Sequence, residues 1–161
     1  MQEEAKGEPM AITVKSAKLW VLHGPDRTGF LADALEPLAS AGANLRVVMA
    51  YCNPSQPDRA AIEVFPVSGK KAEAAARAAG LSPSDTACLL VEGDDRPGLG
   101  AAMARAIAGA GVSMSFFVAE TVGRKFSAVI GFGSEADATT AAKAAKAAAR
   151  TAKSAARTGR R

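Results

Sequence analysis

Short apolar runs and amphipathic stretches alternate along the chain, and the same succession occurs twice. Residues 18–24 and 87–93 are apolar runs that end at glycine, a pattern typical of buried strands. Each run is followed by a stretch whose apolar residues recur every three or four positions, as they do on one face of a helix. The pattern therefore predicts a strand followed directly by a helix, once near the start of the chain and once in its second half.

The two predicted helices match each other position by position. Both end at a glycine, Gly42 or Gly111, which is the residue preferred just past the C-terminus of a helix. The residues expected on their buried faces are Phe30, Ala34, Leu35 and Leu38 in the first helix and Leu99, Met103 and Ile107 in the second. This match indicates an internal repeat.

Two more strands and another helix follow in each repeat. The expected elements are strands at 44–52 and 60–67 and a helix at 70–80 in the first repeat, and strands at 113–122 and 126–132 and a helix that begins after Ser134 in the second. The Pro-rich segment 53–59 is expected to form a long turn. Each repeat thus reads β-α-β-β-α, one strand short of a β-α-β-β-α-β unit.

The repeat itself suggests where the missing strands come from. Residues 81–92 align with residues 12–23. We expect residues 81–85 to form the fourth strand of the first unit, and residues 12–15, from the opposite end of the chain, to form that of the second.

A polar motif stands at the junction of strand and helix in both repeats. Its form is Gly-x-Asp-Arg-x-Gly, and its residues are Gly24, Asp26, Arg27 and Gly29 in the first copy and Gly93, Asp95, Arg96 and Gly98 in the second. A helix that follows such a turn has unpaired N–H groups at its start, which favour an anion. The last glycine of each copy either lets a ligand approach the backbone or only permits the turn.

These motifs resemble the ACT domain. In both repeats "DRxG" follows a strand, and the helix ends in "AGANL" or "AGVSM" before another strand. The resemblance implies an α+β chain of two ferredoxin-like βαββαβ units in tandem, with antiparallel sheets and helices on one face. The corresponding segments are a lead at 1–11, a first unit at 12–86, a second unit at 87–149 and a basic tail at 150–161.

ACT domains commonly bind amino acids in metabolic enzymes and regulators. The resemblance therefore implies a non-catalytic sensor of a free amino acid or similar small metabolite. The implied ligand-binding residues are Asp26, Arg27, Thr28, Gly29, Phe30, Asn44, Asp95, Arg96, Pro97, Gly98, Leu99 and Ser113. Thr28 is replaced by Pro97 and Asn44 by Ser113, so the two sites are expected to differ in affinity. A homodimer and an enzyme or regulator as partner are also expected.

The charge distribution adds a second interpretation. The formal net charge is +4, and every charged residue from Lys143 onward is basic. Five of these residues are spaced as one stripe of a helix: Lys143, Lys146, Arg150, Lys153 and Arg157. The alternative function is therefore a basic-tailed adaptor that binds nucleic acid or an acidic partner. The stripe has no interleaved aromatic residues, so a nucleic-acid partner is disfavoured and a solvated, fraying end is expected.

The remaining residues offer little chemistry. His23 is the only histidine, so a histidine-based metal site is not expected, and no cofactor motif occurs. Asp94 is expected to be solvated and Asp95 to cap the helix, which leaves no catalytic set. Cys52 and Cys88 lie in apolar runs and are expected to be buried thiols. No apolar stretch is long enough to span a bilayer, and a cytoplasmic location is expected.

Overall fold

The computed structural model describes residues 12–158, with side chains up to residue 150. The lead at 1–11 and residues 159–161 lie outside the described part. The described residues form two compact units, one made of Ala17–Thr86 and the other of residues 12–16 together with residues 87–158. The first unit therefore begins at Ala17 rather than at residue 12.

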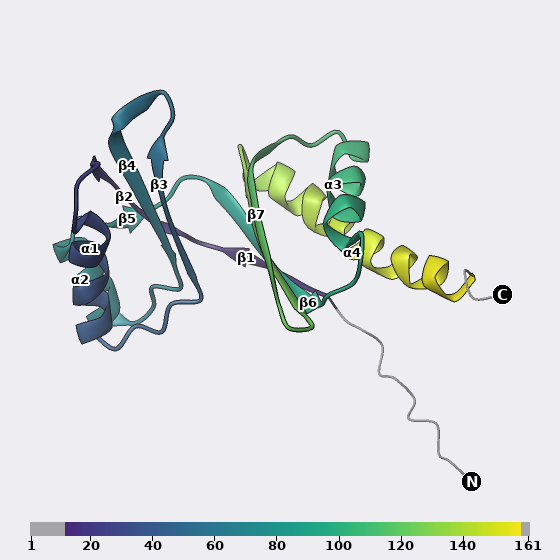
Figure 1. The fold of residues 1–161 in the computed structure, drawn as a ribbon, viewed down its shortest axis with the longest axis horizontal. Coiled ribbons are helices and arrows are strands. Elements are labelled where there is room, and N and C mark those ends of the chain that lie inside the picture. Colours follow the sequence, from purple (N-terminus) through teal and green to yellow (C-terminus); the bar gives the residue numbers. More distant parts are fainter. Residues whose placement is uncertain (1–11, 159–161) are drawn as a thin grey trace, which may run out of the picture. The chain divides into compact units, whose positions relative to one another are not determined.

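The first unit is a four-stranded antiparallel sheet covered on one face by two helices (Figure 1). The strand order is β3-β4-β2-β5. Its elements are β2 (Trp20–Pro25), α1 (Phe30–Ser40), β3 (Val47–Asn53), β4 (Gln56–Phe65), α2 (Lys70–Ala78) and β5 (Ser82–Pro83). The core between sheet and helices contains Trp20, Ala34, Leu38, Ile62, Val64, Ala76 and Leu81, all buried.

The second unit repeats this arrangement, with a much longer last helix. Its strand order is β1-β6-β8-β7, and α3 and α4 cover one face of the sheet (Figure 1). The elements are β1 (Thr13–Ala17), β6 (Ala87–Asp94), α3 (Leu99–Gly109), β7 (Met114–Val122), β8 (Lys125–Phe132) and α4 (Glu135–Thr158). Its core includes Val91, Leu99, Met103, Ile107, Ile130 and Phe132. The α+β fold of two ferredoxin-like units is thus confirmed.

The origin of the fourth strands is also confirmed. In the first unit β5 pairs with β2 through Trp20 and Pro83 and through Val21 and Ser82. In the second unit β1 lies beside β6, and Thr13 Oγ1 donates a hydrogen bond to the carbonyl of Glu92 at 3.3 Å. The second sheet is therefore closed by a strand from the N-terminal end of the chain.

The predicted helix ends are confirmed in detail. After α1, Gly42 adopts a φ of +78°, its N–H donates to the carbonyl of Ala39, and the next N–H donates to Leu38. Gly111 repeats both bonds after α3 with a φ of +75°. This pair of backbone hydrogen bonds defines the Schellman motif, which requires the left-handed conformation that glycine adopts without steric penalty.

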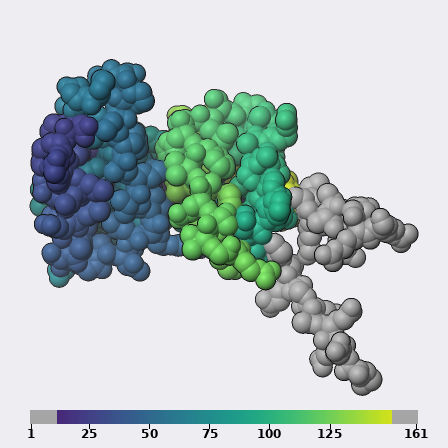
Figure 2. Space-filling model, viewed as in Figure 1, coloured from purple at the N-terminus to yellow at the C-terminus, as the bar shows by residue number. Residues whose placement is uncertain are grey.

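The Pro-rich segment at 53–59 is shorter as a turn than the sequence suggested. A tight turn joins Asn53 to Gln56, because the side-chain oxygen of Asn53 accepts the N–H of Ser55 at 3.0 Å. A register shift beyond Cys52 lets β4 begin at Gln56 in spite of Pro57. The resulting hairpin projects from one end of the first unit (Figures 1 and 2).

The last helix begins where the sequence predicted and continues further. Ser134 Oγ accepts the N–H of Asp137 at 3.1 Å, which caps the start of α4. The helix then runs to Thr158, across the expected tail boundary at residue 150. Its buried face is a row of small residues, Ala138, Ala141, Ala145 and Ala149. None of the helices in the described range has the length and apolarity needed to cross a membrane.

Candidate functional site

The repeated motif forms the same turn in both units. The N–H of Phe30 donates to the carbonyl of Arg27 at 3.2 Å, and the N–H of Leu99 donates to Arg96 at the same distance. The third residue of each turn is a glycine with φ near +85° and ψ near 0°: Gly29 at 86° and −9°, and Gly98 at 82° and 1°. These angles define a type II turn, which requires glycine at this position. The turn alone thus explains the two glycines.

Both turns lead into helices whose first N–H groups have no side-chain cap. Gly29 and Gly98 are the N-cap residues of α1 and α3, and neither helix receives a side-chain hydrogen bond at its start. The prediction that Asp95 caps its helix is therefore wrong, because the type II turn inserts three residues between the carboxylate and the first helical turn. An uncapped helix start offers backbone donors and a partial positive charge to an anion.

The first turn is closed by its own side chains. Arg27 Nη2 forms an ion pair with Asp33 Oδ2 at 2.6 Å, and Nη1 donates to the carbonyl of Thr28 at 3.2 Å. The guanidinium also lies 5.8 Å from the ring centroid of Phe30. That ring packs so closely on Gly24 that a β-carbon there would approach it to 2.5 Å. Arg27 and Phe30 therefore contact the turn itself, and Arg27 pairs with a local acid.

The hairpin reaches the first turn through Asp26. The N–H of Asp26 donates to the carbonyl of Asp58 at 2.8 Å, and the Cys52 thiol donates to Asp26 Oδ2 at 3.2 Å. This hydrogen bond, with smaller contributions from burial and from the carboxylate charge, raises the pKa of Cys52. Cys52 is an exposed free thiol, so the expectation that it is buried is wrong; Cys88 is buried and free. Cys52 remains paired with Ala60 near the end of β3, which is an edge strand of the sheet.

The second turn has the same backbone and different side-chain partners. The N–H of Asp95 donates to the carbonyl of Arg124 at 2.8 Å, as Asp26 does to its hairpin. Arg96, however, extends to α4, where Nη2 donates to the carbonyl of Ala149 at 2.8 Å. The position that corresponds to Asp33 is Ala102, so α3 supplies no acid to Arg96.

The carboxylates beside the second turn also differ from expectation. Asp94 is not simply solvated, because Lys125 Nζ donates to its Oδ1 at 2.6 Å. The Asp95 carboxylate has no hydrogen-bonding partner among the residues that the structure describes. A hollow of about 200 Å³ lies over the strands β6, β7 and β8, lined by Gly93 of the motif together with Glu92, Glu120, Val122, Lys125, Phe126 and Ser127, and no residue of the turn lines it. The second turn thus combines an uncapped helix start with a carboxylate that has no partner among the described residues.

Asn44 and Ser113 lie away from the turns. Each follows the C-terminus of a helix of 11 residues whose N-terminus carries the turn, so roughly 16 Å of helix separates them from Gly29 or Gly98 within the same unit. Within one unit, Asn44 and Ser113 are therefore separated from the turns by the whole length of a helix.

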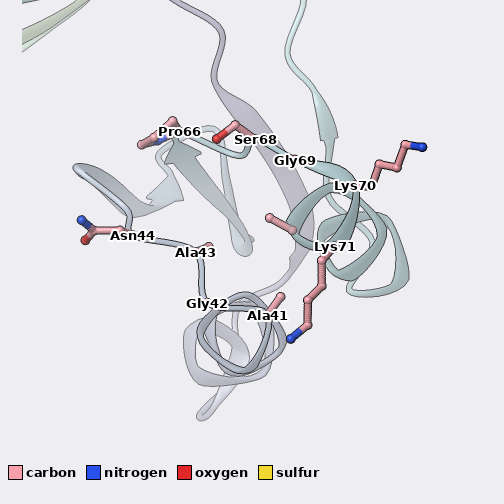
Figure 3. A pocket seen from close by; sticks show the side chains of 10 residues that line it. Ala41, Gly42, Ala43, Asn44, Pro66, Ser68, Gly69, Lys70 and Lys71 are labelled. Carbon is pink, nitrogen blue, oxygen red and sulfur yellow. The ribbon is translucent and has the colours of Figure 1, made fainter.

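Asn44 instead lines a larger hollow of about 470 Å³ at the far end of α1 (Figure 3). Gly42 and Ser68 line the same hollow, together with Lys70 and Lys71 at the start of α2. Figure 3 shows Lys71 extending toward the end of α1, whereas Lys70 points the other way. Asn44 is the one residue of the implied ligand set in this hollow, so the implied residues do not form one site within a unit.

Two partners of the turn arginines were not anticipated from sequence. Asp33 and Ala149 decide where Arg27 and Arg96 point. Alignment of the two repeats could have revealed the first, since an acid on one helix faces Ala102 on the other. Nothing local in the sequence marks Ala149. In the described range, no group of three or more potential metal ligands lies close enough to hold an ion.

Comparison with known sequences gives no match to any family model, and no curated protein matches either. Solved structures do match. The regulatory subunit of aspartate kinase from Thermus thermophilus, in its ligand-free form, superposes with a TM-score of 0.60 at 19% identity, covering 88% of this chain and 96% of that one. A protein from Bacteroides thetaiotaomicron gives 0.65 at 18%, covering 81% and 88%.

A third structure shows the same fold as part of a larger enzyme. Aspartate kinase from Clostridium acetobutylicum, described as an allosteric enzyme, gives a TM-score of 0.57 at 14% identity, covering 91% of this chain and 36% of the kinase. Identities this low establish the fold and leave the ligand open. Taken with the repeated turns and the matched helices, they show that this chain has the fold of a tandem ACT-domain protein.

Proposed function

We propose that this protein is a non-catalytic regulatory sensor that binds a free amino acid, or a small metabolite of similar charge, at its β–α turns. The observation that carries the proposal is the repeated uncapped helix start after a type II turn that an aspartate directly precedes. The similarity to structures described as regulatory subunits of aspartate kinase supports a regulatory role.

The chemistry of the turn suits both charges of an amino acid. The N–H groups at the start of the helix are donors for its carboxylate, helped by the positive end of the helix dipole. The aspartate of the motif is an acceptor for its ammonium group. Both groups lie within a few residues of each other in the chain, so one small zwitterion can contact both.

The second turn is the better candidate of the two. Asp26 of the first turn already accepts the Cys52 thiol, and its arginine is paired with Asp33. Asp95 has no such partner in the described part of the chain, and α3 offers no acid to its arginine. We therefore assign the higher affinity to the second turn.

A thermal-shift screen of the twenty proteinogenic amino acids, each added singly to the full chain, tests the proposal. A ligand present at about 100 times its Kd stabilises the folded state by roughly 2.7 kcal/mol, which raises the melting temperature measurably. If none of the amino acids raises the melting temperature, the proposed function is wrong.

A matched pair of variants then locates the site. Asp95→Asn removes the proposed ammonium acceptor, and Asp94→Asn makes the same change of charge one residue earlier. We expect Asp95→Asn to abolish the shift and Asp94→Asn to keep most of it. If Asp95→Asn keeps the full shift in melting temperature, the ammonium group of the ligand does not bind at the second turn.

The exposed basic residues of α4 favour a second candidate function, an adaptor in which the ACT units serve assembly. Lys143, Lys146 and Arg150 are all exposed on the helix. Retention on a polyanion column at physiological salt, lost on deletion of residues 143–161, would support the adaptor. We also propose that the sensor is a homodimer with an enzyme or regulator as partner. Light scattering at micromolar concentration tests the dimer, and a monomer would contradict it.

A further inference from the structure

Arg96 is bound in a way that leaves part of its guanidinium group unsatisfied. Its Nη2 donates to the carbonyl of Ala149 at 2.8 Å, while its Nε is buried and has no hydrogen-bonding partner among the described residues. No described acidic side chain forms an ion pair with it. A buried donor without an acceptor is unfavourable, and more so when the group carries a charge.

The unsatisfied atom lies on the edge that recognises carboxylates. The Nε–H and an Nη2–H point in the same direction, and together they take both oxygens of a carboxylate in a bidentate pair. In the present structure the carbonyl of Ala149 occupies one of these two donors, and burial shields the other. A carboxylate can reach this edge only if α4 moves away at Ala149.

In the first unit, the equivalent arginine, Arg27, has a different partner. There Arg27 Nη2 is paired with the carboxylate of Asp33, and among the described residues no hydrogen bond or ion pair joins Arg27 to the second helix of its unit. The equivalent of Asp33 is Ala102, so the second unit lacks the internal carboxylate. Its α4 is also long enough to reach the turn arginine, whereas α2 ends after 9 residues.

We propose that Arg96 is a carboxylate-operated latch on α4. In the ligand-free protein it holds the helix at Ala149, and the carboxylate of an amino acid bound at the start of α3 also accepts from the Nε–Nη2 edge and displaces that carbonyl. Binding at the second turn thereby releases α4 from Ala149 onward, the segment that begins with Arg150 and runs past the sheet (Figure 1). The direction of this switch rests on the proposed function, whereas the contact itself does not.

Hydrogen exchange of the α4 amides in the full-length protein tests the latch without any ligand. Arg96→Gln removes the charged donor, and Arg105→Gln makes the same change at an exposed position of α3 in the same unit. We expect Arg96→Gln to speed exchange of the amides after residue 149 by roughly tenfold, the scale of one hydrogen bond from a charged group. Arg105→Gln should leave these rates unchanged. Equal rates in the two variants would overturn the latch.

Ala102→Asp supplies the missing carboxylate from within the chain. It places an acid where α1 has Asp33, so we expect Arg96 to leave Ala149 and the α4 amides to exchange as fast as in Arg96→Gln. If Arg96→Gln speeds exchange and Ala102→Asp does not, Arg96 is an anchor that no carboxylate operates, and the proposal is wrong.

A probe in solution separates this proposal from the proposed function. In ¹⁵N-labelled protein the Arg96 Nε–H signal, assigned by its loss in Arg96→Gln, should move downfield as acetate is added, together with faster exchange in α4. A response to acetate without a response to any amino acid would contradict the sensor and support the latch. An amino acid that binds without moving this signal would contradict the latch and leave the sensor standing.

Discussion

The two β–α turns have one backbone and two different side-chain environments. Gly29 and Gly98 have nearly the same dihedral angles. In each unit, one backbone hydrogen bond of 2.8 Å joins the motif to the neighbouring hairpin. Around that frame, Arg27 folds back onto its own helix, whereas Arg96 crosses to a helix 53 residues further along the chain. The exchange of Asp33 for Ala102 and the greater length of α4 accompany this difference.

The comparison separates what the motif encodes from what its surroundings decide. The glycine and the arginine carbonyl set the turn, and they do so twice with the same result. The partner of the arginine depends on whether the first turn of the following helix carries an acid, and on whether the last helix of the unit is long enough to reach the arginine. Repeats with the same motif can therefore differ in whether their arginine is available to a ligand.

The largest effect expected at the turns comes from their glycines. Gly29→Ala and Gly98→Ala each force a β-carbon into a left-handed conformation, which costs about 1–2 kcal/mol. Space is not the cause, since a β-carbon at Gly98 would meet nothing within 4 Å. Urea unfolding of both variants measures the losses. Similar losses would confirm that the two backbones are equivalent, and a neutral variant would show that its turn adopts another conformation.

An exchange of the second turn residue should have a smaller effect of opposite sign in the two units. Proline is favoured at this position of a type II turn, where Pro97 stands and Thr28 does not. We expect Thr28→Pro to raise the free energy of unfolding by about 0.4–1 kcal/mol and Pro97→Thr to lower it by a similar amount. Thermal melting of both variants checks this, and destabilisation by Thr28→Pro would refute the equivalence of the turns.

Asp33→Ala should change stability less than either exchange. The Arg27–Asp33 pair is about half exposed, with side-chain exposures of 50% and 59%, and such pairs contribute no more than about 1 kcal/mol. The loss measured in urea should shrink further in 0.5 M NaCl because salt screens exposed charges. A loss that does not depend on salt would mean that Asp33 acts through packing.

The smallest effect concerns reactivity and not stability. The hydrogen bond to Asp26 raises the pKa of Cys52, so at pH 8 less of it is the reactive thiolate than in an unperturbed cysteine. Asp26→Asn should lower this pKa and speed alkylation by iodoacetamide, with the rate reaching its plateau at a lower pH. Buried Cys88 should stay unmodified in both proteins. Unchanged alkylation would show that the Cys52–Asp26 contact is not maintained in solution.

Much of this fold follows from local rules that the sequence displays. The apolar periodicity and the glycines at the helix ends predict the strands and the helices. The repeat itself predicts that β1 joins the sheet of the second unit. The error at residues 53–59 came from treating proline as a strand breaker, although a register shift in β4 accommodates Pro57. Local rules also did not predict that Cys52 is exposed, because the apolar run around it does not show that β3 is an edge strand of its sheet.

The candidate site was less predictable than the fold. The type II turns could be expected from Asp-Arg-x-Gly, but the roles of the side chains depend on contacts between distant elements. Arg96 meets Ala149 because α4 packs its alanine row on the core, and Asn44 is separated from Gly29 by the length of α1. Such contacts arise from tertiary packing, which a motif of six residues does not contain.

Because β1 belongs to the sheet of the second unit, its position also determines the order in which the two units can fold during synthesis. All of Ala17–Thr86 is synthesised, and emerges from the ribosome, ahead of β6, the partner strand of β1. At typical rates of synthesis, roughly 4–16 s pass between Thr13 and the residue that it contacts, Glu92. The first unit can therefore fold on the nascent chain while β1 waits unpaired ahead of it. The second unit closes only after β6 has been made, so β1, which is synthesised before the other described strands, is among the last of them to pair.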